Sequence, residues 1–184
     1  MEHIEYEERV LIKYDDYQKI IEDIKKSDIP YTSFIINNIY LDNRDHFIRK
    51  NKYMLRIRTT SHGVNELTLK MNNPDGSCRE INETLREHPT IDKELSGSFN
   101  EYYEIVKLIT NRIEIKREDY LFVIDRNQYL DVVDYDIEIE ASSQEKAKEI
   151  ILEYCNKYNL IYKPNYKNKS TRAFKRLKKM KKSN

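Results

Sequence analysis

Three acidic side chains alternate with isoleucines and a tyrosine in one short stretch of the chain. They are Asp136, Glu138 and Glu140. Successive side chains of an extended strand point to opposite faces, so the three carboxylates would share one face. Neighbouring carboxylates repel each other by about 1 kcal/mol per pair in water, and by more in a low dielectric. The face is therefore either fully solvated, as on an ordinary exposed strand, or held against positive charge.

Other segments repeat this alternation with both signs of charge, so each has one apolar and one charged face. The acids on the charged faces are Glu5, Glu7, Glu80, Asp125, Glu138 and Glu140. The cations are Arg9, Arg56, Arg58, Lys70 and Arg112. Acids gather on the first and last segments and cations on the middle ones, a division that an ordinary solvated surface does not require.

The elements that must position these residues are mostly strands. Period-two alternation predicts strands at 3–12, 33–41, 53–60, 66–71, 78–85, 111–117, 120–125 and 133–140. Apolar residues at helical spacing predict helices after Asp15 or Asp16, over 99–110 and after Ser142 or Ser143, with a short helical turn within 42–51. A turn is expected at 126–128.

Two architectures fit this order of elements. In an ordinary sheet the apolar faces meet and the charges face water, which the alternation alone favours. In a closed barrel the helices cover the apolar faces and the charges line the lumen. Eight antiparallel strands can close in this way, and their interior then holds side chains or one small ligand. The division of charge favours the barrel.

The composition excludes several classes of protein. The length of 184 residues predicts one domain over 1–184. Although 35% of the side chains are charged, the net charge is only +1, so the protein as a whole would not attract a polyanion. Two distant cysteines and three glycines in turns provide neither a metal motif nor a phosphate loop. With no apolar leader or span, we expect a cytoplasmic protein without a membrane partner. The basic tail at about 175–184 is expected to be solvated, and we do not expect nucleic acid as a partner.

The order of these motifs along the chain resembles that of a known family. Glu5-Tyr6-Glu7-Glu8-Arg9 is similar to the ExExK signature of the CYTH superfamily, the triphosphate tunnel metalloenzymes, and the chain looks most like its small stand-alone bacterial members. The resemblance continues through 40–42, 55–58, 67–70, 110–112, 124–125, 134–140 and 168–172. It implies a mainly β (α+β) fold, an eight-stranded antiparallel β-barrel tunnel with flanking helices. It also implies a tunnel that holds a triphosphate and one or two divalent cations, in a monomer or a homodimer.

The resemblance assigns roles to the charged residues. Hard Mg²⁺ or Mn²⁺ prefers oxygen ligands, and the candidate metal ligands are Glu5, Glu7, Glu138 and Glu140, followed by Glu80 and Asp125. The candidate substrate-binding residues are Arg56, Arg58, Lys70, Arg112, Lys169 and Arg172. The candidate catalytic residues are Glu5, Glu7 and Arg9. Arg9 replaces the family lysine; it keeps the charge but cannot lose a proton, so turnover is expected to be slower or differently tuned.

These roles predict a metal-dependent triphosphatase acting on inorganic triphosphate or a small organic triphosphate. A water bound or oriented by the metal would attack the terminal phosphorus, and a glutamate of the first or last strand would accept its proton. Thiamine triphosphatase and class IV adenylate cyclase activities are alternatives within the same fold. A different alternative is a non-catalytic module that binds polyphosphate or nucleotides.

Overall fold

The computed structural model describes residues 2–72, 78–85, 102–163 and 167–183, of which the side chains of 2–5, 72, 78 and 183 are excepted. Its strands are β1 Glu2–Ile12, β2 Thr32–Asn43, β3 Tyr53–Thr60, β4 Asn65–Asn72, β5 Cys78–Thr84, β6 Tyr102–Lys116, β7 Tyr120–Tyr129 and β8 Val132–Ala141. All neighbours pair antiparallel in the order β1-β5-β4-β3-β2-β6-β7-β8, and β8 pairs with β1 to close a barrel. The predicted eight-stranded antiparallel barrel is confirmed.

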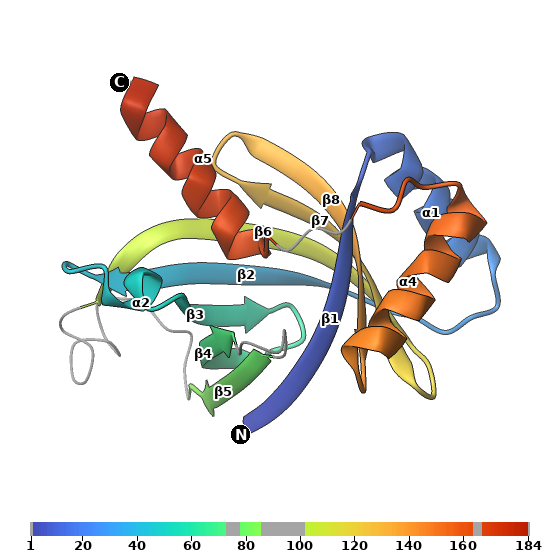
Figure 1. Ribbon diagram of the computed structural model, residues 1–184, viewed down its shortest axis with the longest axis horizontal. Helices are drawn as coiled ribbons and strands as arrows, with labels where there is room; N and C mark the ends of the chain where they lie inside the picture. The colour runs from blue at the N-terminus through green and yellow to red at the C-terminus, as the bar shows by residue number, and fades with distance from the viewer. Residues whose placement is uncertain (1, 73–77, 86–101, 164–166, 184) are drawn as a thin grey trace.

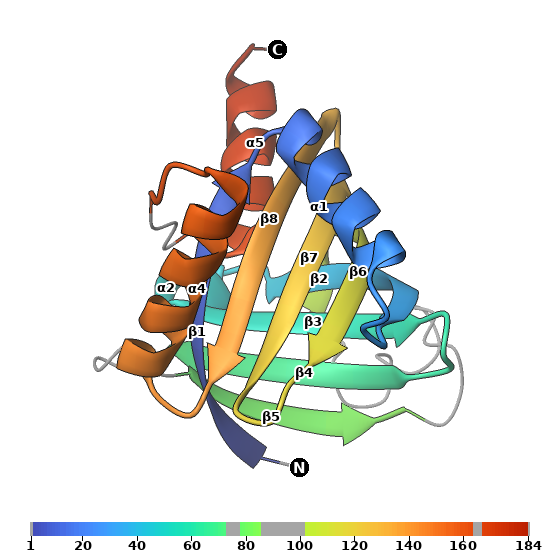
Figure 2. The same cartoon turned by 90° about the vertical axis from the view of Figure 1, so that its right-hand side faces the viewer.

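Two helices cover one side of the barrel. Helix α1 (Tyr14–Lys26) and helix α4 (Gln144–Tyr158) lie over β1, β7 and β8 (Figure 2). Their apolar faces pack on outward side chains of the barrel, including the fully buried Ile124, Ile137 and Ile139. Ser143 caps α4 by accepting the amide N–H of Lys146, as expected, whereas α1 begins after Lys13 without a side-chain cap. The apolar faces therefore point outward under helices, and the charged faces point into the lumen.

Two further helices lie at the other side of the molecule. The short helix α2 (Phe47–Lys50) packs Ile48 against outward residues of β2, β3 and β4. Helix α5 (Lys169–Ser183) begins beside the lumen, packs Ala173 and Phe174 against Tyr40, and runs away from the barrel to the C-terminus (Figure 1). The basic tail is therefore the outer part of a helix whose first turn reaches the barrel interior.

The helix predicted over 99–110 is wrong for residues 102–110, and residues 99–101 lie outside the described residues. Residues 102–110 belong to the 15-residue strand β6, which pairs along β2 and β7. The apolar residues that suggested a helix include Tyr103 and Ile109, which are exposed, whereas Leu108 is fully buried. The turn predicted at 126–128 is also wrong, because β7 continues to Tyr129 and the chain turns at Leu130, which has a positive φ of 51°.

Glu8 lies on the apolar side of β1 between Tyr6 and Val10, and the fold accounts for it. Its side chain is 5% exposed. One carboxylate oxygen accepts a hydrogen bond of 2.7 Å from the Gln144 amide, and the other accepts one of 3.1 Å from the Tyr162 hydroxyl. Buried polar groups are retained where they are hydrogen-bonded, so Glu8 ties β1 to α4 and to the segment after it.

Candidate active site

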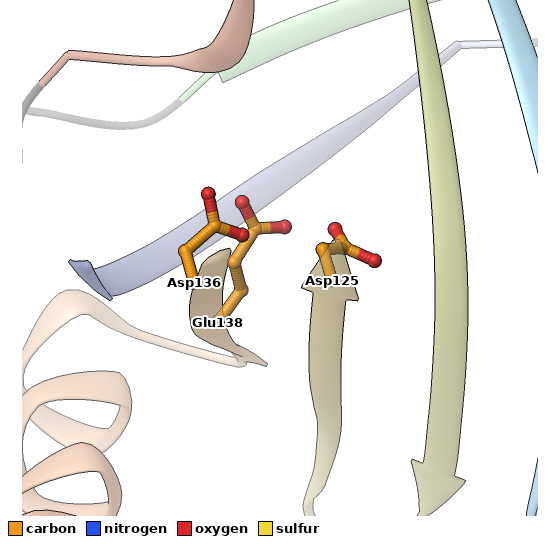
Figure 3. A group of neighbouring side chains, drawn as sticks. All are labelled: Asp125, Asp136 and Glu138. Carbon is orange, nitrogen blue, oxygen red and sulfur yellow. The ribbon is translucent and has the colours of Figure 1, made fainter. Parts of the chain in front are cut away.

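Three buried carboxylates meet on the inner face of β7 and β8 (Figure 3). Asp125 lies opposite Asp136 in the β7–β8 register, and Glu138 follows two residues later on the same face. One oxygen of each carboxylate lies within 4.8 Å of the other two. Asp125 and Asp136 are fully buried, and Glu138 is 2% exposed. Charges buried this deeply are stable only when they are paired or coordinate a metal.

Cations from three other elements surround this acidic group. Arg112 of β6 donates a bidentate pair of hydrogen bonds to Asp125, at 3.0 and 2.8 Å, and a third bond of 3.2 Å to Glu138. The Lys169 ammonium of α5 lies 2.8 Å from Asp125 and 2.5 Å from Glu138. Arg9 of β1 donates to Glu138 and, at 3.2 Å, to Glu7. Glu138 is therefore the shared partner of three basic side chains.

A second group of ion pairs, centred on Arg172, fixes the start of α5. Arg172 donates two hydrogen bonds to Asp134, at 2.8 and 2.9 Å, and one of 2.5 Å to Asp136. The Tyr129 hydroxyl donates to the same Asp134 at 2.6 Å. The guanidinium of Arg172 is thus engaged by carboxylates of β8, and it does not line the lumen cavity. Its effect is to hold Lys169, one turn earlier in the helix, over the acidic group.

The acidic group and its cations shift one another's pKa values. Burial alone would raise the pKa of Glu138, but Arg9, Lys169 and Arg112 outweigh it and hold that pKa well below its usual range. Burial lowers the pKa of the Lys169 ammonium, yet Asp125, Asp136 and Glu138 raise it overall. Burial raises the pKa of Asp136, and the negative charge of Glu138 adds to the increase against the opposing cations. The surrounding cations therefore compensate the burial of Asp136 only in part.

The opposite part of the lumen is rich in cations. Arg56 and Arg58 of β3 and Lys70 of β4 point into the same cavity as Arg112 and Lys169. The Glu80 carboxylate of β5 lies among them, 3.2 Å from the Arg56 guanidinium and 3.4 Å from the Lys70 ammonium. Arg58 donates to the side-chain oxygen of Asn38 at 3.1 Å. Its nearest carboxylate in the described part of the chain, Glu66, is 4.0 Å away.

Two features of these arginines are complementary to an anionic ligand. Burial, together with the like charges of Arg56 and Arg112, lowers the pKa of Arg58 to about 10. The Nε–H of Arg56 is buried and has no hydrogen-bond partner among the described residues. A buried donor without a partner costs about 1–3 kcal/mol, and more when the group is charged. Oxygens of a bound anion would satisfy the donor and relieve the repulsion between the guanidinium groups.

The structure places most of the predicted site residues around one lumen. Its cavity, of about 80 Å³, is lined by the predicted residues Glu7, Arg9, Arg56, Arg58, Lys70, Glu80, Arg112, Glu138, Glu140 and Lys169. The backbone of Glu5 lies opposite Cys78 in the β1–β5 pairing, but the Glu5 side chain lies outside the described residues. Glu80 does not join Asp125 and Glu138, because its carboxylate is held by Arg56 and Lys70.

Sequence reasoning left open the role of one residue that the structure places at the centre. Asp136 shares the charged face of its predicted strand with Glu138 but is not among the candidate metal ligands, and the structure places it fully buried beside Asp125 and Glu138. The alternation with Glu138 was the available signal, since residues two apart on a strand share a face. Asn168, directly before α5, and Ser170 in its first turn also line the lumen. Both fall within the 168–172 segment of the resemblance, which assigned them no role.

Comparison with known families decides the relationship. The family model described as "CYTH domain" matches residues 3–174, which is nearly the whole chain. The chain belongs to the CYTH family. The predicted family is therefore confirmed, and this CYTH domain has the charged barrel lumen that the resemblance implied.

Solved structures agree with the family. A Bacillus halodurans protein, provisionally named an adenylate cyclase, is 26% identical, with a TM-score of 0.76 over 94% of this chain and 98% of that one. A Hippeastrum protein provisionally named an adenylyl cyclase, for which a dominant triphosphatase activity is described, is 17% identical, with a TM-score of 0.68 over 92% and 93% of the two chains. The protein PH1819 of Pyrococcus horikoshii is 18% identical, also with a TM-score of 0.68, over 95% and 98%.

The search of curated proteins finds no match for the chain. Within the described residues, no helix of this CYTH domain combines the length and apolar character needed to cross a membrane.

The low pKa of Glu80 predicts an acid-sensitive contribution to stability. Burial opposes ionisation of Glu80, but Arg56 and Lys70 outweigh it and lower its pKa from 4.5 to about 2. A carboxyl group with a depressed pKa stabilises the folded state above its unfolded pKa, and that stabilisation is lost as the pH falls through the folded value. We expect Glu80→Gln to be less stable than the wild type at neutral pH. The difference should shrink by about 3 kcal/mol as the pH approaches 2.

Urea unfolding at a series of pH values measures this difference directly. Glu83→Gln is the matched control, because Glu83 lies on the same strand but is exposed. A difference between wild type and Glu80→Gln that does not change with pH would contradict the ion pairing of Glu80.

Proposed function

We propose that this CYTH domain is a divalent-metal-dependent hydrolase of inorganic triphosphate or a small organic triphosphate. The observation that carries the proposal is the pair of opposed charge groups in one buried lumen. The Nε–H of Arg56 has no hydrogen-bond partner and Arg58 has no carboxylate closer than 4.0 Å among the described residues. Both side chains face a cavity that also reaches Glu138 of the acidic group. A linear polyanion bound to divalent cations is complementary to such a lumen. The triphosphatase activity described for the Hippeastrum relative is consistent with it.

The acidic group fits a divalent cation by its donor chemistry. Its three carboxylates offer hard oxygen ligands within 4.8 Å of one another, the type that Mg²⁺ and Mn²⁺ prefer. One oxygen of Asp136 is buried without a hydrogen-bond partner, so it has coordination capacity left. Asp125, Asp136 and Glu138 would hold the ion, and Glu5, Glu7 and Glu140 remain the further candidates from the sequence. When bound, such an ion neutralises phosphate oxygens and lowers the pKa of its water.

The basic side chains of the lumen would bind the substrate. Arg56 and Arg58 can each donate several hydrogen bonds to phosphate oxygens, and bidentate pairs of this kind are among the strongest in proteins. The Lys169 ammonium now neutralises the acidic group at 2.5–3.5 Å from three carboxylates. Cation binding there would make this neutralisation redundant, so Lys169 would be released to contact a phosphate.

The proton of the attacking water needs an acceptor among the lumen residues. Arg9 is unsuited, because Glu138 and Glu7 outweigh its burial and raise the pKa of its guanidinium. The pKa of Glu138 is held so low by its three cations that it is a weak base. Glu7 and Glu140 lie opposite each other in the β1–β8 register and both line the cavity. Arg9 and Lys70 outweigh the burial of Glu7 and lower its pKa as well, but not as far as that of Glu138. We assign the proton acceptor to Glu7 or Glu140.

A phosphate-release assay tests the proposal. Purified protein with Mg²⁺ or Mn²⁺ should release phosphate from tripolyphosphate, and chelation of the metal should remove the activity. Thiamine triphosphate and ATP in the same assay distinguish the organic substrates, and measurement of cyclic AMP detects cyclase chemistry. Tight binding of all three compounds with no phosphate release would instead identify a non-catalytic module.

A further inference from the structure

A second and much larger cavity opens from the lumen. It has a volume of about 740 Å³ and lies between α5, α2, β3 and β6. Met54, Lys70, Asn168 and Ser170 line both this cavity and the lumen, so the two spaces adjoin. We call the larger cavity the vestibule. A ligand that filled the lumen and continued beyond it would enter the vestibule.

The vestibule is strongly basic. One acid, Glu104, faces seven cationic side chains: Arg49, Lys52, Lys70, Lys175, Lys178, Lys181 and Lys182. Arg49 is paired with Asp42 at 2.8 Å, and Lys70 with Glu80 at 3.4 Å. The side chains of the other five lysines form no ion pair or hydrogen bond with any residue that the structure describes. Their mutual repulsion favours an anionic ligand.

The lysines of α5 form a track that leads away from the lumen. Lys175, Lys178 and Lys182 are three and four residues apart, a spacing that places side chains on the same helix face. At 1.5 Å per residue, the track from Lys175 to Lys182 is about 10 Å long. The helix begins beside the lumen and runs outward from the barrel (Figure 1). The positive charge therefore extends along the direction in which a linear polyanion would leave the lumen.

Of the aromatic side chains in the vestibule, Phe174 and Tyr53 pack against neighbouring side chains, whereas Tyr103 is exposed. The Phe174 ring meets the edge of Tyr40 at 5.8 Å between centroids and has the Arg49 guanidinium 5.4 Å above it. The Tyr103 hydroxyl lies 3.4 Å from the His46 ring. A nucleoside or single-stranded RNA needs a free ring face for stacking, whereas a chain of phosphates needs only cations. With seven cationic side chains and one exposed ring, the vestibule is better matched to a chain of phosphates than to a stacked nucleoside.

We propose that the vestibule is a binding site for inorganic polyphosphate chains longer than three units, with the terminal triphosphate in the lumen and the following phosphates on the lysines of α5. This inference rests on the proposed function and specifies its substrate class. It gives α5 two roles: its first turn closes over the acidic group, and its outer turns bind the chain.

Binding measurements test the inference separately from hydrolysis. Titration calorimetry in the absence of divalent metal would compare tripolyphosphate with a medium-chain polyphosphate. We expect the longer chain to bind the wild type about tenfold more tightly or better. The triple variant Lys175→Gln, Lys178→Gln, Lys182→Gln should lose this advantage and keep its affinity for tripolyphosphate. For the long chain, the slope of the logarithm of its binding constant against the logarithm of the salt concentration should fall in magnitude by about 2–3.

The matched control carries the same change in charge elsewhere. Lys19→Gln, Lys25→Gln, Lys148→Gln alters exposed lysines of α1 and α4, and it should bind both ligands as the wild type does. Equal affinity of the wild type for the two ligands would overturn the inference, as would a triple variant that loses both affinities alike. Equal binding of single-stranded RNA at matched phosphate concentration would show a general polyanion surface and would also overturn it. Failure of the proposed function alone would instead show as chain-length-dependent binding without phosphate release.

Discussion

Replacing Glu138 with glutamine is expected to remove nearly all metal-dependent hydrolysis of tripolyphosphate. The Glu138 carboxylate is the shared partner of Arg9, Arg112 and Lys169 and belongs to the acidic group that would hold the cation. Loss of a charged group of this kind in a buried site lowers turnover by about 10²–10³-fold. Three buried cations would also lose a partner, which costs about 3–5 kcal/mol when a buried pair is broken.

The measurements are phosphate release, calorimetric titration with Mn²⁺ and urea unfolding of the same preparations. Glu114→Gln is the control, because Glu114 also pairs with Arg112, at 3.3 Å, but is 24% exposed and does not line the lumen cavity. We expect the control to retain its activity and most of its stability. A folded Glu138→Gln protein with full metal-dependent activity would show that this carboxylate is not part of the site.

Replacing Arg58 with methionine is expected to weaken tripolyphosphate binding without destabilising the protein. Burial and the like charges of Arg56 and Arg112 lower the pKa of Arg58, so its cationic form is less favourable in the folded state than in the unfolded chain. Below a pH of about 10 the charge therefore opposes folding, and its removal should leave the melting temperature unchanged or higher. Hydrogen bonds from a charged donor contribute about 1.5–3 kcal/mol, so affinity should fall by about 10–150-fold.

Arg112→Met provides the contrast within the same lumen. Arg112 is paired with Asp125 and Glu138, and these carboxylates outweigh its burial and raise the pKa of its guanidinium. Its removal leaves buried carboxylates with one cation fewer, so we expect a loss of about 3–5 kcal/mol in stability. Thermal unfolding and tripolyphosphate titration of both variants separate the two cases. If Arg58→Met were as unstable as Arg112→Met, Arg58 would be a structural ion-pair partner rather than a substrate-binding residue.

The barrel was predictable because its strands carry a repeated pattern with a consistent division of charge. In β3 the alternation of Arg56 and Arg58 with apolar residues correctly placed two cations on one face. Local alternation alone did not tell whether that face was inside or outside. Acids on the first and last strands and cations between them favoured the lumen, and the resemblance to the CYTH family pointed to the same fold.

The start of β6 was not predictable from local spacing. Tyr102, Tyr103, Val106 and Ile109 fit a helical stripe, but the segment pairs with β2 on one side and β7 on the other. Pairing along a closed barrel buries Leu108 completely and leaves Ile109 exposed, the reverse of the helical pattern. Tertiary pairing thus outweighs the local preference, as it often does for short apolar segments.

The contacts within the site required the three-dimensional structure. The sequence placed Lys169 and Arg172 at the substrate, but only the position of α5 shows that both contact the acidic group. The separation of Glu80 from Asp125 likewise depends on barrel order, since β5 lies next to β1 and β4 while β7 lies next to β6 and β8. The sequence therefore assigned Glu80 and Asp125 the same role as metal ligands. The fold places Asp125 in the acidic group and Glu80 among the cations of the opposite part of the lumen.

A crystal structure with Mn²⁺ and a non-hydrolysable triphosphate analogue tests the central claim most directly. We expect an anomalous Mn²⁺ signal at Asp125, Asp136 and Glu138, with phosphate oxygens bound to Arg56 and Arg58 and with Lys169 moved away from the acidic group. Mn²⁺ and the analogue bound only outside the lumen, with Lys169 still on Glu138, would contradict it.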